Sequence, residues 1–147
     1  MIDCYVLSPV RSSQIATRFL DLFLPDREPS FATSDPSEVL NLPSDTSLDT
    51  IFAYLANNPQ TEYTFYWRSM SSSDPRNAML VFNADGSLIV GVSVLCPDPS
   101  THDSVELVAR SWCGRLSASV ANATSDSPPP LWGGELSPPT RADFAIR

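Results

Sequence analysis

The sequence predicts an α+β domain, with a mostly antiparallel sheet of four or five strands and helices packed on one face. Three observations support this fold class. Apolar residues recur at helical spacing in three segments, strand-like patterns occupy four others, and an Asp-Gly turn joins two of those strands. The expected order is β-α-α-β-β-β-α, with an optional short strand at the end.

The first strand is expected over residues 4–8, because Pro9 ends its apolar run. A helix should follow. Ser12 or Ser13 offers an N-cap, and apolar residues then recur at roughly helical spacing until Pro25.

Residues 26–45 are rich in proline, serine and acidic residues, which indicates a long surface loop. A brief extended piece is expected within it, over residues 38–42.

The second helix has the clearer pattern. Thr46 or Ser47 can cap it, and Asp49 in the first turn favours the positive end of the helix dipole. The apolar residues from Leu48 to Leu55 follow the i, i+3, i+4, i+7 spacing of one helix face. Two asparagines and a proline then end the helix.

Three strands are expected over residues 63–70, 78–82 and 88–94, which are rich in aromatic and β-branched residues. The sequence Asn-Ala-Asp-Gly between the last two predicts a tight hairpin. The predicted register pairs Phe82 with Leu88 and places one apolar set on the core face. The opposite face is less apolar and carries Met79, Val81, Ile89, Gly91 and Ser93.

A third helix is expected from a cap at Ser100 or Thr101 to about Leu116, and residues 117–123 could add a short edge strand. Residues 1–124 are therefore interpreted as a single domain. The remaining residues, 125–147, contain five of the fourteen prolines and are interpreted as a proline-rich tail. This tail could stay loose, pack on the body through Leu131 and Trp132, or act as a docking ligand.

Composition argues against several function classes. The net charge is −8 and the chain contains no lysine, so nucleic acid is a poor partner. No apolar run is long enough to span a membrane and no export signal is recognised, which predicts a cytoplasmic protein without a membrane partner. An acidic surface suits capture of a basic protein, although it also serves solubility alone.

Catalytic and metal-binding patterns are missing from the sequence. Cys4, Cys96 and Cys113 have neither disulfide nor zinc spacing, and His102 has no second ligand spaced for it. The glycines form no phosphate-binding loop. We therefore expect no enzyme activity, no cofactor and no metal.

The aromatic strand at residues 63–70 is the strongest candidate for a binding surface. Alternation places Trp67 with Phe65 on one side, and Tyr66 with Arg68 on the other. Trp67 or Tyr66 together with Arg68 has the composition of an interface hot spot. The competing interpretation is that Arg68 pairs with Asp74 and only fixes the following loop.

Several stretches together resemble small bacterial immunity proteins of polymorphic-toxin and contact-dependent growth inhibition systems. They are "YVLSP" at residues 5–9, "RFLDLFLPDREP" at residues 18–29, the block at residues 63–94, and the later "PPP". The resemblance covers about the first 96 residues, and its most specific part is residues 66–94. The C-terminal portion departs from the family pattern.

This resemblance implies a non-enzymatic antidote that binds a cognate toxin domain, with carboxylates standing in for phosphates of a nucleic-acid substrate. The partner-binding residues it implies come from the acidic loop, the second helix and the aromatic block. They are Asp26, Glu28, Asp35, Glu38, Asp45, Asp49, Tyr66, Trp67, Arg68, Asp74 and Arg76.

Two alternatives stay open. A small-ligand-binding or regulatory domain would use the outer sheet face and Trp67 as pocket walls. An enzyme of unfamiliar type would use Asp74 and Arg68.

Overall fold

A computed structural model describes residues 1–30, 35–98 and 100–125, with side chains described up to residue 119. The predicted tail beyond residue 125 lies outside this part of the chain. Within it the elements are β1 (Ile2–Ser8), α1 (Ser13–Phe23), β2 (Arg27–Pro29), α2 (Pro36–Val39), α3 (Leu48–Asn57), β3 (Tyr63–Ser69), β4 (Asn77–Phe82), β5 (Leu88–Val94) and α4 (His102–Ser125).

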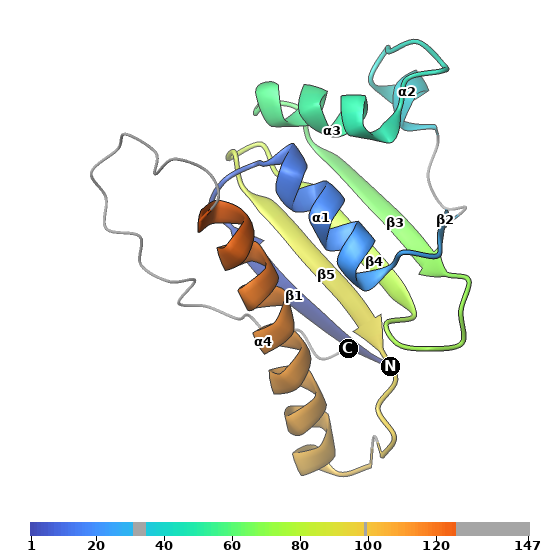
Figure 1. The fold of residues 1–147 in the computed structure, drawn as a ribbon, viewed down its shortest axis with the longest axis vertical. Helices are drawn as coiled ribbons and strands as arrows, with labels where there is room; N and C mark the ends of the chain where they lie inside the picture. Colours follow the sequence, from blue (N-terminus) through green and yellow to red (C-terminus); the bar gives the residue numbers. More distant parts are fainter. Residues whose placement is uncertain (31–34, 99, 126–147) are drawn as a thin grey trace.

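The five strands form one sheet in the order β1-β5-β4-β3-β2, and every neighbouring pair is antiparallel. Helices α1, α3 and α4 lie over the same face of this sheet (Figure 1). The predicted fold class is therefore confirmed. The short edge strand β2 was not predicted as a strand, because its three residues lie within residues 26–45, whose composition is typical of a loop.

Helices α1 and α3 begin where the sequence predicts. The Ser12 hydroxyl accepts a hydrogen bond from the backbone N–H of Ile15, and the Ser47 hydroxyl accepts one from Thr50. Such N-caps satisfy backbone donors that have no partner within the helix. Each helix then turns its apolar stripe toward the sheet.

The β4–β5 hairpin also has the predicted register, with Phe82 opposite Leu88. The backbone N–H of Asn83 donates to the Ser87 carbonyl at 3.0 Å, which closes the turn. Gly86 has φ = 84°, a left-handed conformation that favours glycine. The local sequence therefore determines this hairpin.

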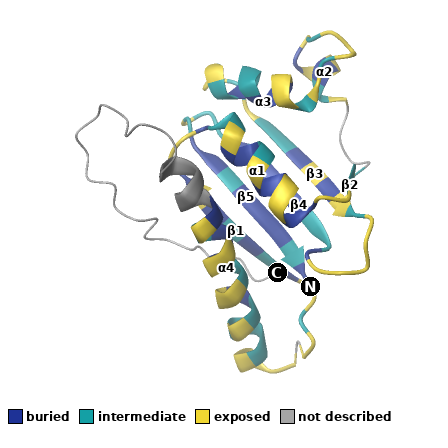
Figure 2. Ribbon diagram, viewed as in Figure 1, coloured by how far each residue is buried: buried dark blue, intermediate teal, exposed yellow. Residues whose placement is uncertain are grey.

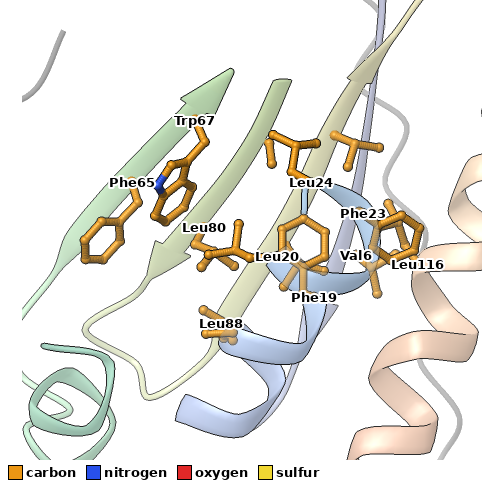
Figure 3. Packing of buried hydrophobic residues seen from close by; sticks show 14 of the residues in the cluster. Val6, Phe19, Leu20, Phe23, Leu24, Phe65, Trp67, Leu80, Leu88 and Leu116 are labelled. Carbon is orange, nitrogen blue, oxygen red and sulfur yellow. The ribbon is translucent and has the colours of Figure 1, made fainter. Parts of the chain in front are cut away.

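The core lies between the sheet and the three helices. Alternate residues of each central strand point into it, and the helices bury their sheet-facing sides (Figure 2). Phe65 and Trp67 from β3 project on the same side as α1, whose Phe19 and Phe23 face the sheet (Figure 3). Phe52 of α3 adds an aromatic ring whose centroid lies 5.3 Å from that of Phe65.

Arg11 is buried although it is charged, with 6% of its surface exposed. Its guanidinium donates hydrogen bonds to the backbone carbonyls of Leu55, Asn58, Thr61 and Asn83. Burial lowers its pKa. This side chain thus joins the end of α3, the loop before β3 and the β4–β5 hairpin.

Two local predictions were wrong. Part of residues 38–42 lies in the short helix α2 and not in an extended piece, because Asp35 caps that helix by accepting from the Ser37 N–H at 2.9 Å. Residues 117–123 continue α4 instead of forming a strand. The buried stripe of Ala109, Cys113 and Leu116 keeps helical spacing across Gly114, so the glycine does not end the helix.

In the described ranges, no helix combines the length and apolar character that crossing a bilayer requires.

Candidate functional site

The sheet face opposite the helices, here called the outer face, is the first of two candidate surfaces. Register partners line up across it in rows, because paired residues project to the same side of a sheet. The first row is polar and runs Asp3, Ser93, Asn77, Arg68, Glu28 from β1 to β2. Its ends are paired: the Ser93 hydroxyl donates to the Asp3 carboxylate at 2.6 Å, and Arg68 forms an ion pair with Glu28.

The second row, here called the tyrosine row, runs Tyr5, Gly91, Met79, Tyr66. The Tyr5 ring covers Gly91 so closely that an added Cβ at Gly91 would lie 2.3 Å from Tyr5 Cδ1. Only a residue without a side chain allows this position of the ring. Tyr66 stands at the other end of the row and is 43% exposed.

The third row is Leu7, Ile89, Val81 and Thr64, so it is largely apolar. Leu7 is exposed, while Ile89 and Val81 are partly exposed. The outer face therefore changes from polar to apolar along the strands, with the tyrosine row in between.

A groove of about 530 Å³ lies over the polar and tyrosine rows. Asp3, Tyr5, Met79 and Tyr66 are among its lining residues. Two phenol groups, one thioether and one carboxylate can together hold an extended apolar ligand that carries a polar or cationic end.

The structure separates the predicted aromatic residues. Tyr66 lies on the outer face with Arg68, but Trp67 is in the core, 4% exposed, with its ring stacked 5.3 Å from that of Phe65. The prediction that Trp67 contacts a partner is therefore wrong. The ligand-binding alternative loses the same residue, since Trp67 does not line the groove.

Asp74 and Arg76 pair with each other, their Oδ1 and Nε atoms 3.4 Å apart. Asp74 also accepts from the Leu95 N–H at 3.2 Å, and its peptide bond to Pro75 is cis. The predicted pairing of Arg68 with Asp74 is thus wrong, because Arg68 pairs with Glu28. The enzyme alternative combined these two residues, and they belong to different ion pairs.

The predicted acidic contacts form a second candidate surface. From residue 28 to residue 62, here called the acidic segment, the chain carries six carboxylates and no basic residue. Five of the six are exposed, and they surround α2 and α3: Asp35, Glu38, Asp45, Asp49 and Glu62. Asp26 is also exposed but lies just before β2, outside this segment.

Some of these carboxylates have structural partners. Hydrogen bonds from the Ser37 side chain and backbone lower the pKa of Asp35. Asp49 accepts from the Thr17 hydroxyl at 2.9 Å, which links α3 to α1. Both side chains are nevertheless exposed at the surface.

Sequence reasoning missed the groove residues contributed by β1. The hairpin register alone pairs Met79 with Gly91, but it does not show that β1 adds Asp3 and Tyr5 beside β5. Only the strand order reveals this. No local signal in the sequence specifies it.

The described residues offer little for covalent or metal chemistry. Burial raises the pKa of the Cys4 thiol to about 12, so this group stays protonated at neutral pH. Within the described ranges no three His, Cys, Asp or Glu side chains are grouped to hold a metal ion.

The candidate surfaces are thus a groove on the outer face and an acidic segment around α2 and α3. Asp35 belongs to the acidic segment, and Tyr66 lines the groove. Comparisons with protein-family models, with curated proteins and with solved structures find no match to this chain.

Proposed function

We propose that this protein is a cytoplasmic immunity protein, which binds a basic toxin domain and blocks it without catalysing a reaction. The observation that carries this proposal is the acidic segment. The segment contains no basic residue, and five of its six carboxylates are exposed on or beside α2 and α3.

Such a surface suits a basic nuclease. Enzymes that bind nucleic acid present cationic clefts to phosphates, and carboxylates held in a fixed arrangement can occupy those clefts. Complementary charge also raises the association rate by orders of magnitude at low salt. An antidote benefits from this, because it must bind the toxin before the toxin reaches its target.

Helix α3, which belongs to the acidic segment, is anchored in the core. Helix α3 buries Ile51, Phe52 and Leu55 in the core, and Asp49 is hydrogen-bonded to α1. The carboxylates on and beside α3 therefore need little ordering when a partner binds, which lowers the entropic cost of the complex.

The first experiment co-expresses this protein with a basic, toxin-like domain encoded next to its gene and counts the surviving cells. We expect survival with the protein and loss of viability without it. The purified pair should form a complex whose association rate falls as salt is raised. If such a domain kills cells equally in both cases and no complex forms, the proposal is wrong.

Charge variants then test which surface is used. The triple variant Glu38→Gln, Asp45→Asn, Asp49→Asn removes three charges from the acidic segment with little change in shape. We expect its association rate at low salt to fall by roughly tenfold or more.

The matched control is Asp98→Asn, Asp103→Asn, Glu106→Gln, which removes one charge from the loop before α4 and two from its first turns. It should leave the association rate nearly unchanged. Equal losses in the two variants would show that net charge alone matters, and would contradict the assignment of the acidic segment as the interface.

A further inference from the structure

The two edges of the sheet are protected to different degrees. At one edge, β2 has only three residues, ends in Pro29, and carries two charged side chains that are held in ion pairs. Short length, proline and charged side chains all hinder the addition of a further strand. At the other edge, β1 is seven residues long, contains no proline, and has Asp3 as its only charged residue. This second edge is therefore suited to pairing with another strand.

The alternation of hydrogen bonds shows which backbone groups of β1 face outward. In the β4–β5 hairpin, the Asn83 N–H donates to the Ser87 carbonyl, and hydrogen-bonded pairs then alternate along both strands. This turns the even-numbered residues of β5 toward β1, and their partners, the even-numbered residues of β1, toward β5. The N–H and C=O groups of Asp3 and Leu7 are thus directed away from the sheet. Among the described residues, no strand lies beyond β1.

Residues 142–147 have the pattern that such an edge accepts. Apolar side chains at positions 142, 144 and 146 alternate with Asp143, Ala145 and Arg147. This period of two is typical of a strand with one buried side. We propose that residues 142–147 form a sixth strand, which runs antiparallel to β1 of the same molecule and hydrogen-bonds to its outward-facing backbone groups.

The inner side of the sheet selects the register of this strand. Paired residues project to the same side, so Phe144 opposite Val6 and Ile146 opposite Cys4 both point to the side that α4 covers. Val6 and Cys4 already belong to the core there. A shift by one residue would turn both apolar side chains to the outer face and bring Asp143 to the core side. The register with residue 144 opposite residue 6 is therefore favoured.

The outer side fits the same register. Arg147 then lies opposite Asp3, and opposite charges on neighbouring strands attract each other. The Asp3 carboxylate already accepts from the Ser93 hydroxyl, and its two oxygens leave room for a guanidinium as well. Ala145 lies opposite Tyr5, whose ring leans over Gly91 toward β5, so only a small neighbour is needed on the other side.

The connection to α4 is long enough. The Cys4 thiol lies 4.0 Å from the Ala109 carbonyl, and α4 continues from there for about 24 Å to Ser125. Figure 1 shows α4 and β1 running in the same general direction, and Ser8 lies about 13 Å along β1 from Cys4. The chain must therefore return by about 10 Å and descend about 10 Å from the helix layer to the sheet.

The 16 residues from 126 to 141 span up to roughly 50 Å at about 3.1 Å per residue, which exceeds this distance. A strand that starts near Ser8 then runs antiparallel to β1. The tether also raises the effective concentration of the segment to about the millimolar range, which favours pairing within one molecule over pairing between molecules.

The test measures backbone hydrogen exchange by NMR on the full chain. We expect the N–H groups of Asp3 and Leu7 to exchange roughly a hundredfold or more slowly than in an unstructured peptide, because a sixth strand accepts their hydrogen bonds. Fast exchange of both groups in the unmodified chain overturns the proposal.

A pair of proline variants tests the predicted hydrogen bonds. Ala145→Pro removes an N–H that faces β1 in the proposed register, so protection of Asp3 and Leu7 should be lost. Ala142→Pro removes an N–H that faces away from β1, and it should keep the protection. Unchanged protection in Ala145→Pro, or equal loss in the two variants, contradicts the proposal.

A pair of double variants tests which side chains are buried. Phe144→Ser with Ile146→Ser removes both apolar side chains from the inner side, and exchange at Leu7 should become at least roughly tenfold faster. Asp143→Ser with Ala145→Ser changes only the outer side and should leave exchange nearly unchanged. Equal effects of the two double variants would contradict the alternation on which the strand depends.

Nuclear Overhauser effects between α protons give the register and distinguish one copy from two. We expect them between Phe144 and Val6 and between Ile146 and Cys4, because pairs without hydrogen bonds bring their α carbons closest. In an equimolar mixture of isotope-labelled and unlabelled protein, we expect none between copies. Effects found only between copies would mean that the strand is exchanged with a second molecule, which overturns the proposal. Absence of any effect between residues 142–147 and β1 overturns it too, and leaves the edge to another protein.

These outcomes are independent of the proposed function. Figure 1 shows α2 and α3 on the side of the sheet where β3 and β2 lie, away from β1. None of the variants changes a residue of the acidic segment. Toxin binding through that segment can therefore fail or succeed whether or not the sixth strand forms.

Discussion

The two faces of the sheet bury neighbouring side chains to very different degrees. Phe65 and Tyr66 are neighbours on β3, yet Phe65 is 5% exposed and Tyr66 is 43% exposed. One ring belongs to a packed aromatic cluster beneath the helices, and the other stands beside a groove. The difference shows that a single strand can supply the core with every second residue and a binding surface with the rest.

The central strands present apolar side chains on the inner face, whereas the polarity of the outer face changes along the strands. Inner positions of β4 and β5 are uniformly apolar, while outer positions change from the polar row through the tyrosine row to the apolar row. Uniform apolar positions are what a core needs. A graded surface is unnecessary for folding, which is why we assign function to the outer face and the acidic segment.

The largest effect is expected from Phe65→Ala. The substitution removes a buried ring that packs against Tyr63, Trp67 and Phe52, and should lower the free energy of unfolding by about 3–5 kcal/mol. Denaturant titration measures this loss. If Phe65→Ala were no more destabilising than a change on the outer face, the contrast between the faces would be wrong.

A second loss of stability is expected from Arg11→Met, which keeps the bulk of the side chain but removes its hydrogen bonds. The Leu55 carbonyl at the end of α3, whose hydrogen bond to Arg11 is buried, would lose its donor at a cost of about 1–3 kcal/mol, while the partly buried carbonyl of Asn83 can bind water instead. Arg11→Lys should recover only part of this loss, because an ammonium cannot reproduce the guanidinium fork. Thermal unfolding of both variants tests this, and full recovery by lysine would contradict it.

Gly91→Ala tests the close approach on the outer face. The new Cβ would collide with the Tyr5 ring, so we expect a loss of about 1–2 kcal/mol as the ring is displaced. In the double variant Gly91→Ala, Tyr5→Ala the collision is gone, and the two losses should not add. A double-mutant cycle by denaturation measures this coupling. Strict additivity would mean that Tyr5 does not rest on Gly91.

The smallest effect is expected from Tyr66→Ala. This side chain is partly exposed and lies outside the core, so the free energy of unfolding should change by less than about 1 kcal/mol. The same denaturant titration as for Phe65→Ala makes the two neighbours directly comparable. A decrease in the free energy of unfolding as large as that of Phe65→Ala would show that outer-face side chains also stabilise the fold.

Much of the fold follows from local sequence. The caps of α1 and α3, the hairpin glycine and the alternation of β3, β4 and β5 each depend on residues close together in the chain. The position of β1 beside β5 could not be predicted, because nothing local specifies which strand it pairs with. The short elements β2 and α2 were missed for the opposite reason: they are too brief to show a period.

The candidate site was predicted less well than the fold. Alternation placed Tyr66 and Arg68 on the outer face correctly, and the same alternation buries Trp67, whose size and chemistry had suggested an interface. The ion pair between Arg68 and Glu28 requires β2 beside β3, a contact between residues distant in sequence. Contacts between side chains on neighbouring strands can be predicted only once the strand order is known.

The pairing of β1 with β5 has a consequence for synthesis of the protein. Residue 2 lies opposite residue 94, so β1 is synthesised about 90 residues before the strand that it pairs with in this sheet. During that interval the apolar side of β1, with Cys4 and Val6, cannot be covered by its final neighbours on β5 and α4. Nascent chains stalled before residue 88 should therefore bind chaperones at their N-terminal segment, and those stalled well after α4 should not.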